Sequence, residues 1–401
     1  MASHVVLGLG GGVDYELELS SPTLERLAGE YRIRDAELTS SASVADERDL
    51  VISILAHLKK GGGGEHFIAS PGALHAFAGR FPKRVTLGGT AVRAAIAMSR
   101  LGVPSTLHLV SFNDVFRRLL PDSCDHVCSG RQDTLYPHLI VQYDRDIRVR
   151  VDDIDICAPS PNRLIYVNDP ANEALVLSDE LGLLLRDARV FLISGFNAVR
   201  DQRVLDRRLS TLRCHMRQLP PGAFVYYEDA AFHQPAFSQR VRDALLDVID
   251  VYGLNEDEMQ SYLGHAVNLL SVTQVERALK SLQALIPAPT LVVHTRYWSA
   301  TVGEAAGRYA GPLNDGIVIA STRYSHGDDY TDQHHERMRS RPRRTEALQF
   351  AAALEDRMGE AVRCLPGFNL DVAEPTTIGL GDTFVGGFLA ALCRKEAASW
   401  T

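Results

Sequence analysis

Apolar and polar residues alternate with two different periods along this 401-residue chain, and the alternation predicts an α/β fold. A short apolar run at 4–9 predicts a buried strand, and apolar residues recur at helical spacing within 22–60. After residue 185, strand-like runs and helical stretches follow one another to the end of the chain. Strands that alternate with helices form a mainly parallel sheet covered by helices, so we expect one large α/β core.

Two internal stretches modify this picture. Residues 85–103 follow the order strand, glycine turn and helix, and a further strand at 105–110 predicts a βαβ unit with parallel strands. Three alternating strands at 138–144, 147–154 and 163–169 are separated only by short turns. Such spacing favours antiparallel pairing outside the parallel sheet. We therefore expect a β-containing lid inserted into the core.

Two polar stretches carry no clear periodicity. The run HGDDYTDQHHE at 326–336 holds several potential metal ligands without a recognisable ligand spacing, so we expect a polar loop. The arginine-rich run at 336–344 also predicts a solvated loop. A phosphate-binding role for these arginines is the alternative.

Composition excludes several classes of protein. The formal net charge of −8 argues against a general nucleic-acid binder, and no apolar run reaches the ~18 residues of a membrane span. The first residues, MASHVVLGLG, lack the basic region of a signal peptide. The six cysteines are scattered, which favours free thiols over a zinc site. We expect a cytoplasmic protein, monomeric or homodimeric, without a nucleic-acid or membrane partner.

The glycines of VVLGLGGGVDYE, at 5–16, raise the question of a dinucleotide-binding fingerprint. That fingerprint needs a third glycine or alanine, but the two possible positions hold Val13 and Tyr15. A P-loop is also excluded, because no GK[ST] string occurs. Any phosphate must therefore be held by backbone amides, arginine and a metal ion.

The strongest candidate for such chemistry is IGLGDTF near the end of the chain. Gly379 and Gly381 flank Leu380, and Asp382 follows at the start of an apolar helix. A glycine turn at a helix start leaves unpaired amides that bind anions, and a carboxylate there can accept a proton from a hydroxyl. The alternative is a tight turn in which Asp382 only caps the helix.

Carboxylates follow two other predicted strands. In GLNEDEM, Asn255 and Glu258 lie three residues apart at a strand-to-helix junction, where they either hold Mg²⁺ through water or form a capping box. These two roles are compatible. Glu228 ends a predicted strand and either lines the ligand crevice or is a solvated acid.

Two further stretches have both a binding and a structural interpretation. Gly88 and Gly89 permit either close approach of a ligand or merely a tight turn. His294 and Arg296 follow a predicted strand and either face the crevice or serve the fold.

In this order, the stretches resemble the ribokinase-like superfamily, and most closely the ADP-dependent glucokinase and phosphofructokinase family. The resemblance rests on GLGD at 379–382, NEDE at 255–258 and the Gly88-Gly89 pair, and extends over most of the chain. It implies a three-layer α/β/α core with a mainly parallel sheet and a smaller α+β lid. The core would comprise 1–13, 86–132 and 171–401, and the lid 14–85 and 133–170.

The resemblance further implies Mg²⁺-dependent transfer of a terminal phosphoryl group from a nucleotide, ADP in preference to ATP, to a hydroxyl of a sugar or sugar phosphate. Asp382 would be the catalytic base, and the amides at 379–382 the anion hole. Metal binding would fall to Glu228 and Glu258. Nucleotide binding would involve Asn255, His294, Thr295 and Arg296, and acceptor binding Asp14, Gly88, Gly89 and Asn113. Asp14 would be carried onto the acceptor by the glycines that follow a central strand at 5–9.

The chain departs from the family pattern at three places. Tyr226 replaces the histidine of the family's HxE motif, and Arg93 replaces a small apolar residue after the glycine pair. The residues after GDT, Phe384-Val385-Gly386, are closer to the ATP-using ribokinase branch. Two alternatives therefore stay open: an ATP-dependent kinase of a nucleoside or unusual sugar, and a non-catalytic ligand-binding protein on the same fold.

Overall fold

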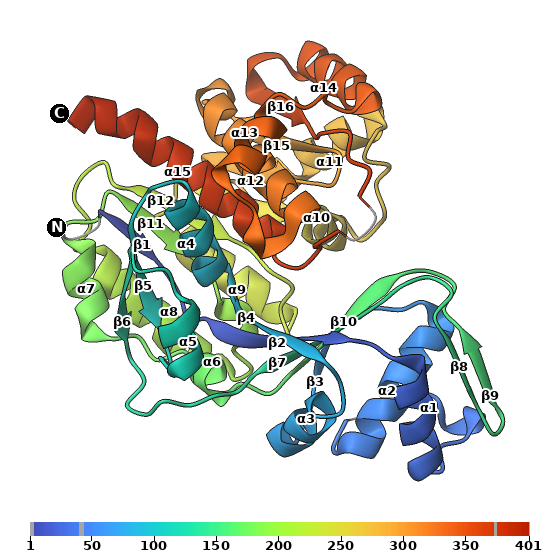
Figure 1. The fold of residues 1–401 in the computed structure, drawn as a ribbon. Helices are drawn as coiled ribbons and strands as arrows, with labels where there is room; N and C mark the ends of the chain where they lie inside the picture. The colour runs from blue at the N-terminus through green and yellow to red at the C-terminus, as the bar shows by residue number, and fades with distance from the viewer. Residues whose placement is uncertain (1–3, 40–43, 373–374, 401) are drawn as a thin grey trace.

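The computed structural model describes residues 4–39, 44–372 and 375–400, which build two separate main sheets (Figure 1). The larger sheet has nine strands within these residues, in the order β16-β15-β14-β13-β12-β11-β1-β5-β6. Pairing is parallel from β6 to β14 and antiparallel at β15 and β16. The strands are β1 (Val5–Leu7), β5 (Ser105–Leu109), β6 (Cys124–Cys128), β11 (Val190–Ile193), β12 (Phe224–Glu228), β13 (Val251–Asn255), β14 (Thr290–His294), β15 (Trp298–Gly303) and β16 (Val362–Pro366).

Helices cover both faces of this sheet. In β1, Val5 and Leu7 pack into one apolar cluster and Val6 into another, because successive side chains point to opposite faces of a strand. The predicted three-layer α/β/α core is therefore confirmed. Around the first cluster lie α4 (Thr90–Arg100), α5 (Asp114–Leu119), α12 (Ala310–His326), α13 (Asp332–Arg339) and α15 (Leu380–Trp400); around the second lie α6 (Pro170–Ala174), α7 (Asp179–Leu185), α8 (Gln202–Met216), α9 (Ala236–Leu245), α10 (Glu256–Leu263), α11 (Val272–Leu285) and α14 (Thr345–Met358).

The smaller sheet, with its helices, forms what we call the small unit (Figure 1). Its order is β3-β10-β7-β2-β4. One face of the sheet packs against three helices through an apolar cluster that includes Leu139 and Val141 of β7. The elements are β2 (Gly12–Glu18), α1 (Ser21–Glu30), α2 (Glu47–Lys60), β3 (Gly64–Phe67), α3 (Pro71–Ala78), β4 (Lys83–Gly88), β7 (His138–Tyr143) and β10 (Asn162–Val167).

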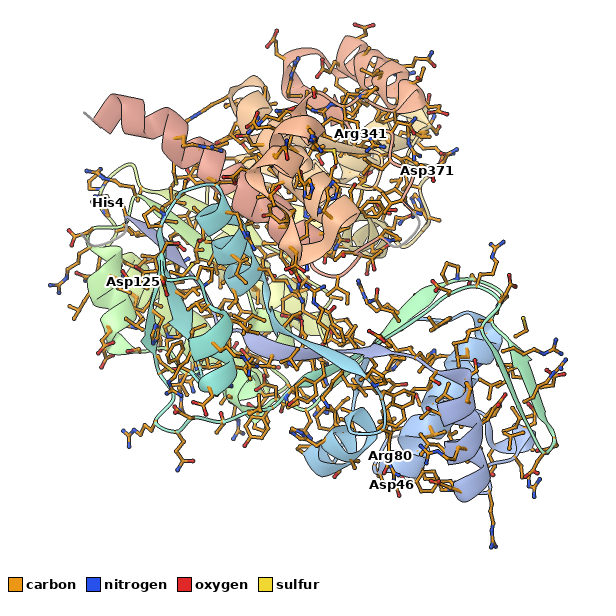
Figure 2. All side chains as sticks on the ribbon, in the orientation of Figure 1. His4, Asp46, Arg80, Asp125, Arg341 and Asp371 are labelled. Atoms are coloured by element: carbon orange, nitrogen blue, oxygen red, sulfur yellow. The ribbon has the colours of Figure 1, made fainter. Side chains whose placement is uncertain are left out.

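Local signals explain where the helices of the small unit begin. The Asp46 side chain accepts a hydrogen bond from the Asp49 amide at 2.9 Å, so it caps α2. Figure 2 shows Asp46 near Arg80, at the end of the small unit away from the larger sheet.

A separate hairpin, β8 (Arg148–Val151) and β9 (Ile154–Cys157), lies beside α1.

The route of the chain between the two sheets agrees with one prediction and corrects another. Strand β1 is central, and the chain leaves it through Gly10 and Gly11 to enter β2. The predicted βαβ unit at 85–110 is wrong, because β4 pairs antiparallel with β2 in the small unit while β5 lies in the larger sheet. Period-two alternation identifies a strand but not the sheet that it joins.

The inserted strands are partly as predicted. The strands β7 and β10 pair antiparallel, as expected, but β7 also pairs parallel with β2. The strand expected over 147–154 joins neither, and forms the separate hairpin instead. The domain boundaries expected from the resemblance remain a prediction.

The loops predicted at 326–336 and 336–344 contain a helix, so that expectation is wrong. Thr331 caps α13 by accepting a hydrogen bond from the His334 amide at 3.3 Å. His335 and Met338 are buried at helical spacing on one side of it. The polar composition of the stretch conceals the fact that these two residues are buried. Among the described residues, no helix is both long enough and apolar enough to cross a bilayer.

Candidate active site

The glycine turn predicted to bind an anion lies at the N-terminus of α15. Gly379 has a φ of +64°, which favours glycine, and the helix begins at Leu380. Asp382 lies within the first turn, so the structure does not support the interpretation of Asp382 as a residue that precedes and caps the helix. The carboxylate is 24% exposed. The first amides of a helix have no intrahelical acceptor.

Arg93 of α4 covers Gly379. A Cβ atom at Gly379 would lie 2.4 Å from Cδ of Arg93, so a larger residue has no room. The guanidinium donates to Asp14 Oδ2 at 2.7 Å, and its Nε lies 4.0 Å from Asp382 Oδ2. Asp14 belongs to the small unit and Asp382 to α15. A single arginine therefore joins the predicted acceptor residue to the predicted base.

Asp14 has a second cationic neighbour, which the sequence did not indicate. His138 Nδ1 lies 3.5 Å from Asp14, and its Nε2 lies 3.4 Å from Asp169. Burial opposes the charged imidazole, but the contact with Asp169 and the charges of Asp14 and Glu65 outweigh it and raise the pKa of His138 to about 9. Gly88 packs against the Asp14 carboxylate and leaves no room for a side chain, because a Cβ there would lie 2.5 Å from both Asp14 oxygens.

Glu228 and His294 form the other side of the site. His294 Nε2 lies 2.7 Å from Glu228 Oε1, and a Cβ at Gly381 would lie 2.9 Å from the imidazole. Burial raises the pKa of Glu228, His294 opposes that rise, and the charge of Asp382 adds to it. The chain has Tyr226 at the HxE histidine, yet Glu228 still has an imidazole partner, supplied by β14. Its Oε2 has no hydrogen-bond partner among the described residues.

Asn255 and Glu258 form the capping box of α10. Asn255 Oδ1 accepts from the Glu258 amide at 3.0 Å, and the Asn255 amide donates to Glu258 Oε2 at 2.7 Å. Burial and the charges of Asp229 and Glu228 hold the pKa of Glu258 well above its ordinary value. Glu228, Asp229 and Glu258 are thus close enough for their charges to interact. Asp229 accepts hydrogen bonds from Tyr227 at 3.1 Å, Tyr252 at 2.9 Å and Tyr262.

The remaining predicted residues also have structural partners. Thr295 Oγ1 accepts from the amides of the two residues that follow Arg296, which stabilises the turn after β14. Arg296 is 66% exposed and pairs with Glu256 at 2.7 Å. Asn113 caps α5 and donates to the Thr134 carbonyl at 3.0 Å. Gly89, with φ of +91°, lies against Gly11.

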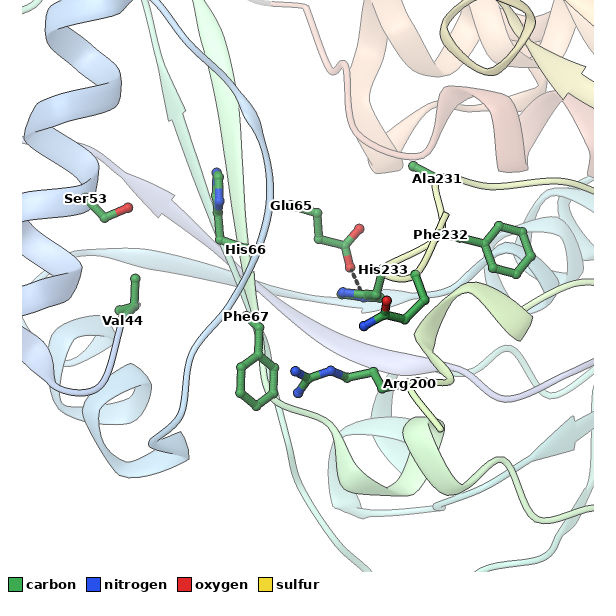
Figure 3. Close-up of a pocket in the computed structure, with 10 residues that line it drawn as sticks. Val44, Ser53, Glu65, His66, Phe67, Arg200, Ala231, Phe232 and His233 are labelled. Carbon is green, nitrogen blue, oxygen red and sulfur yellow. Dashed lines mark ion pairs between the residues drawn. The ribbon is translucent and has the colours of Figure 1, made fainter. Parts of the chain in front are cut away.

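A cavity of about 420 Å³ lies between the small unit and the larger sheet (Figure 3). Figure 3 shows Glu65 of β3 paired across it with His233, which follows β12; their atoms lie 2.9 Å apart. The Arg200 guanidinium stacks 3.7 Å from the Phe67 ring. The charge of Glu65 helps to raise the pKa of His138, and the charge of His138 helps to lower the pKa of Glu65, so this cavity is connected electrostatically to the surroundings of Asp14. Sequence reasoning did not find these residues, because none belongs to a local motif.

Arg163 of β10 is another residue that the motifs did not single out. Its NH1 donates to the Thr377 carbonyl at 3.4 Å, so the small unit contacts the turn before α15. Burial lowers the pKa of Arg163, the charge of Asp382 opposes this, and Arg93 adds to it. Asp382, in the first turn of α15, therefore lies near both Arg93 and Arg163.

Among the described residues, no group of three or more His, Cys, Asp or Glu side chains is arranged as a metal site.

Comparison with known families decides the class of protein. A family model described as the ADP-specific phosphofructokinase/glucokinase conserved region matches residues 3–338. The chain belongs to this family. Membership confirms the prediction of an ADP-dependent sugar kinase. The matched segment ends before Gly379, so it does not include the glycine turn of α15.

Structural comparison agrees with the family. A hypothetical ADP-dependent phosphofructokinase from Pyrococcus horikoshii OT3 superposes with a TM-score of 0.78 at 17% identity, covering 98% of each chain. A phosphofructokinase from the same organism, with AMP, gives 0.76 at 17% identity and the same coverage. An ADP-dependent kinase in complex with fructose-6-phosphate and ADPβS gives 0.75 at 12% identity, covering 98% of this chain and 94% of that one. Comparison with curated proteins finds no significant match.

Proposed function

We propose that this ADP-dependent kinase transfers the terminal phosphoryl group of ADP, with Mg²⁺, to a hydroxyl of a sugar or sugar phosphate held between the small unit and the larger sheet. One observation carries the proposal: Asp14 of the small unit and Asp382 of α15 meet on the guanidinium of Arg93. A residue suited to acceptor hydroxyls therefore lies next to a residue suited to removing their proton.

Asp382 would act as the general base. Its carboxylate is partly exposed and stands at a helix N-terminus, where the amides of Gly379, Leu380 and Gly381 would bind an anion. As the acceptor oxygen bonds to phosphorus, its proton passes to Asp382, and the amides stabilise the charge on the transferred group. Fixed dipoles of this kind need no reorganisation during the reaction.

The acidic residues behind the site fit a magnesium ion. Mg²⁺ is usually held by one or two carboxylates together with substrate phosphates and several waters. Glu228 and Glu258 supply two carboxylates, and one oxygen of Glu228 has no hydrogen-bond partner among the described residues. Burial raises the pKa of both groups, and the charges of neighbouring carboxylates raise it further. When bound, the ion would neutralise phosphate charge. His294 would orient Glu228 through the 2.7 Å contact.

The nucleotide would bind beside these residues. Asn255 and His294 are direct neighbours on β13 and β14, at the carboxyl end of the sheet, where open α/β sheets bind ligands. Thr295 and Arg296 follow in the next turn, which supports their assignment to the nucleotide side. We place the nucleotide across this edge.

The acceptor would occupy the cavity that Glu65 and His233 bridge, with Asp14, Gly88 and Gly89 at its inner end. Asn113 lines a separate, smaller hollow together with Gly12 and Asp169. The fructose-6-phosphate in a structurally similar kinase supports a phosphorylated sugar as one acceptor to test. The segments 14–85 and 133–170 would close over it as a lid, since closure excludes water from the reaction.

The Asp382→Asn variant tests this function. We expect kcat to fall about 10²- to 10⁴-fold, the range of general acid–base catalysis, with ADP affinity retained. The assay would use ADP and ATP with glucose, fructose 6-phosphate and a nucleoside panel, with and without Mg²⁺. Near-normal turnover of Asp382→Asn would contradict the assignment of the base. ATP as the better donor would contradict the assignment of the nucleotide.

A further inference from the structure

We infer that Arg93 is a catalytic residue, which completes the anion hole by binding the transferred phosphoryl group from the acceptor side. This inference rests on the proposed function. Three observations support it: Arg93 has unused hydrogen-bond donors, its side chain lies against the N-terminus of α15, and its guanidinium lies close to Asp382.

Most hydrogen-bond donors of Arg93 are unused. A guanidinium has five N–H donors. Among the described residues it makes one hydrogen bond, to Asp14 at 2.7 Å, because Glu16 at 3.7 Å and Asp382 at 4.0 Å lie beyond hydrogen-bonding distance. The side chain is only 6% exposed. The donors that Arg93 does not use within the protein are available to a ligand.

The free donors lie against the anion hole. The position that a Cβ would take on Gly379 is 2.8 Å from Nε and 3.0 Å from NH1 of Arg93. The N-terminus of α15 carries partial positive charge, so a cation beside it is unfavourable on its own. An anion between the guanidinium and the amides removes this repulsion. Arginine suits phosphate because its planar donors match two oxygens at once.

The proximity of Arg93 to Asp382 makes its contribution larger in the transition state. As the bond between phosphorus and the bridging oxygen of ADP breaks, AMP leaves with the electron pair and the new bond forms to the acceptor oxygen. The acceptor proton passes to Asp382, which loses its negative charge. The guanidinium of Arg93 lies 4.0 Å from Asp382. Once Asp382 is neutral, the phosphoryl oxygens become the main negative charge that faces this guanidinium.

Two variants of Arg93 test the inference. Arg93→Met removes the charge and keeps a long unbranched side chain. Arg93→Lys keeps the charge but lacks the paired N–H donors of the guanidinium. Arg240→Met is the matched control, because that arginine pairs with Asp206 on the surface at 2.9 Å. Each protein would be assayed for kcat and KM, and for binding of inorganic phosphate in the presence of AMP by calorimetry.

We expect Arg93→Met to lower kcat about 10²- to 10³-fold, as removal of an oxyanion donor does, with KM for ADP changed less than about threefold. Phosphate affinity should fall about tenfold, and Arg93→Lys should be intermediate in both. The control should match the wild type. If Arg93→Met does not fold, the kcat and phosphate affinity of Arg93→Lys decide the question.

Unchanged kcat and phosphate affinity in a folded Arg93 variant would overturn the inference, and would leave Arg93 as a structural partner of Asp14. Failure of the proposed function looks different. A wild-type protein that phosphorylates no acceptor, yet binds phosphate through Arg93, would contradict the sugar-kinase proposal and support the anion site.

Discussion

His294 holds the carboxylate of Glu228, although 66 residues separate them in the chain. The pair spans three neighbouring strands, β12 to β14, and the imidazole also lies against Gly381. The sequence has a tyrosine where the HxE motif has histidine, and the fold supplies the imidazole from another strand. One histidine therefore connects the proposed metal carboxylate to the proposed anion hole.

The pair predicts a stability effect. Removing one partner of a buried polar pair leaves the other unsatisfied at a cost of about 1–3 kcal/mol. We expect His294→Leu to lower the free energy of unfolding by about this amount and to raise the pKa of Glu228 further, since His294 now lowers it. Urea unfolding measures the first effect. The exposed His265→Leu is the control, and an unchanged unfolding midpoint for His294→Leu would argue against the pair.

Glu258 offers a test of the two compatible roles of the NxxE stretch. Glutamine preserves a capping box but removes the charge that crowds Glu228 and Asp229. We expect Glu258→Gln to retain or gain stability, while the Mg²⁺ concentration for half-maximal activity rises about tenfold, because one carboxylate contributes to the metal site. A titration of activity with MgCl₂ checks this. Unaltered Mg²⁺ dependence would mean that Glu258 only caps α10.

Gly88 provides a test of the acceptor side. A methyl group at Gly88 would lie 2.5 Å from both oxygens of Asp14, so Gly88→Ala must displace that carboxylate. We expect kcat/KM for the acceptor to fall about tenfold or more, which corresponds to about 1.4 kcal/mol, while ADP affinity stays the same. Gly307→Ala is the matched control, because nothing lies within 4 Å of its added Cβ. Equal losses in both variants would refute the acceptor assignment.

His138 predicts a pH dependence of stability. Its pKa is about 9 in the folded protein, above the ordinary value of about 6.5. The interactions of the charged imidazole with Asp14, Asp169 and Glu65 therefore stabilise the fold fully below pH ~6.5, and this contribution is lost as pH rises towards 9. We expect His138→Gln to be destabilised at pH 6 and to approach the wild type at pH 9.5. Urea unfolding at several pH values would show this convergence, and a constant difference between the proteins would contradict it.

Local motifs accounted for part of the site. The glycine turn with Asp382 and the capping box at Asn255 are short stretches whose backbone chemistry is set by their own residues. The sequence alone therefore predicted a helix N-terminus with a carboxylate, and a capped helix with a second carboxylate. It also predicted a buried strand at the start of the chain, since a continuous apolar run bounded by glycines suits a buried parallel strand.

The tertiary structure decided what those motifs contact. Arg93 was visible in the sequence only as a departure from a pattern. One of its partners, Asp14, lies 79 residues before it in the chain, and the other, Asp382, lies near the end of the chain. His138 and Glu65 belong to no motif, and β4 alternates as a strand of either sheet would. Periodicity and spacing describe neighbours along the chain, whereas ion pairs and cavities depend on which strands become adjacent. Only the folded chain therefore showed that one arginine lies between the proposed acceptor residue and the proposed base.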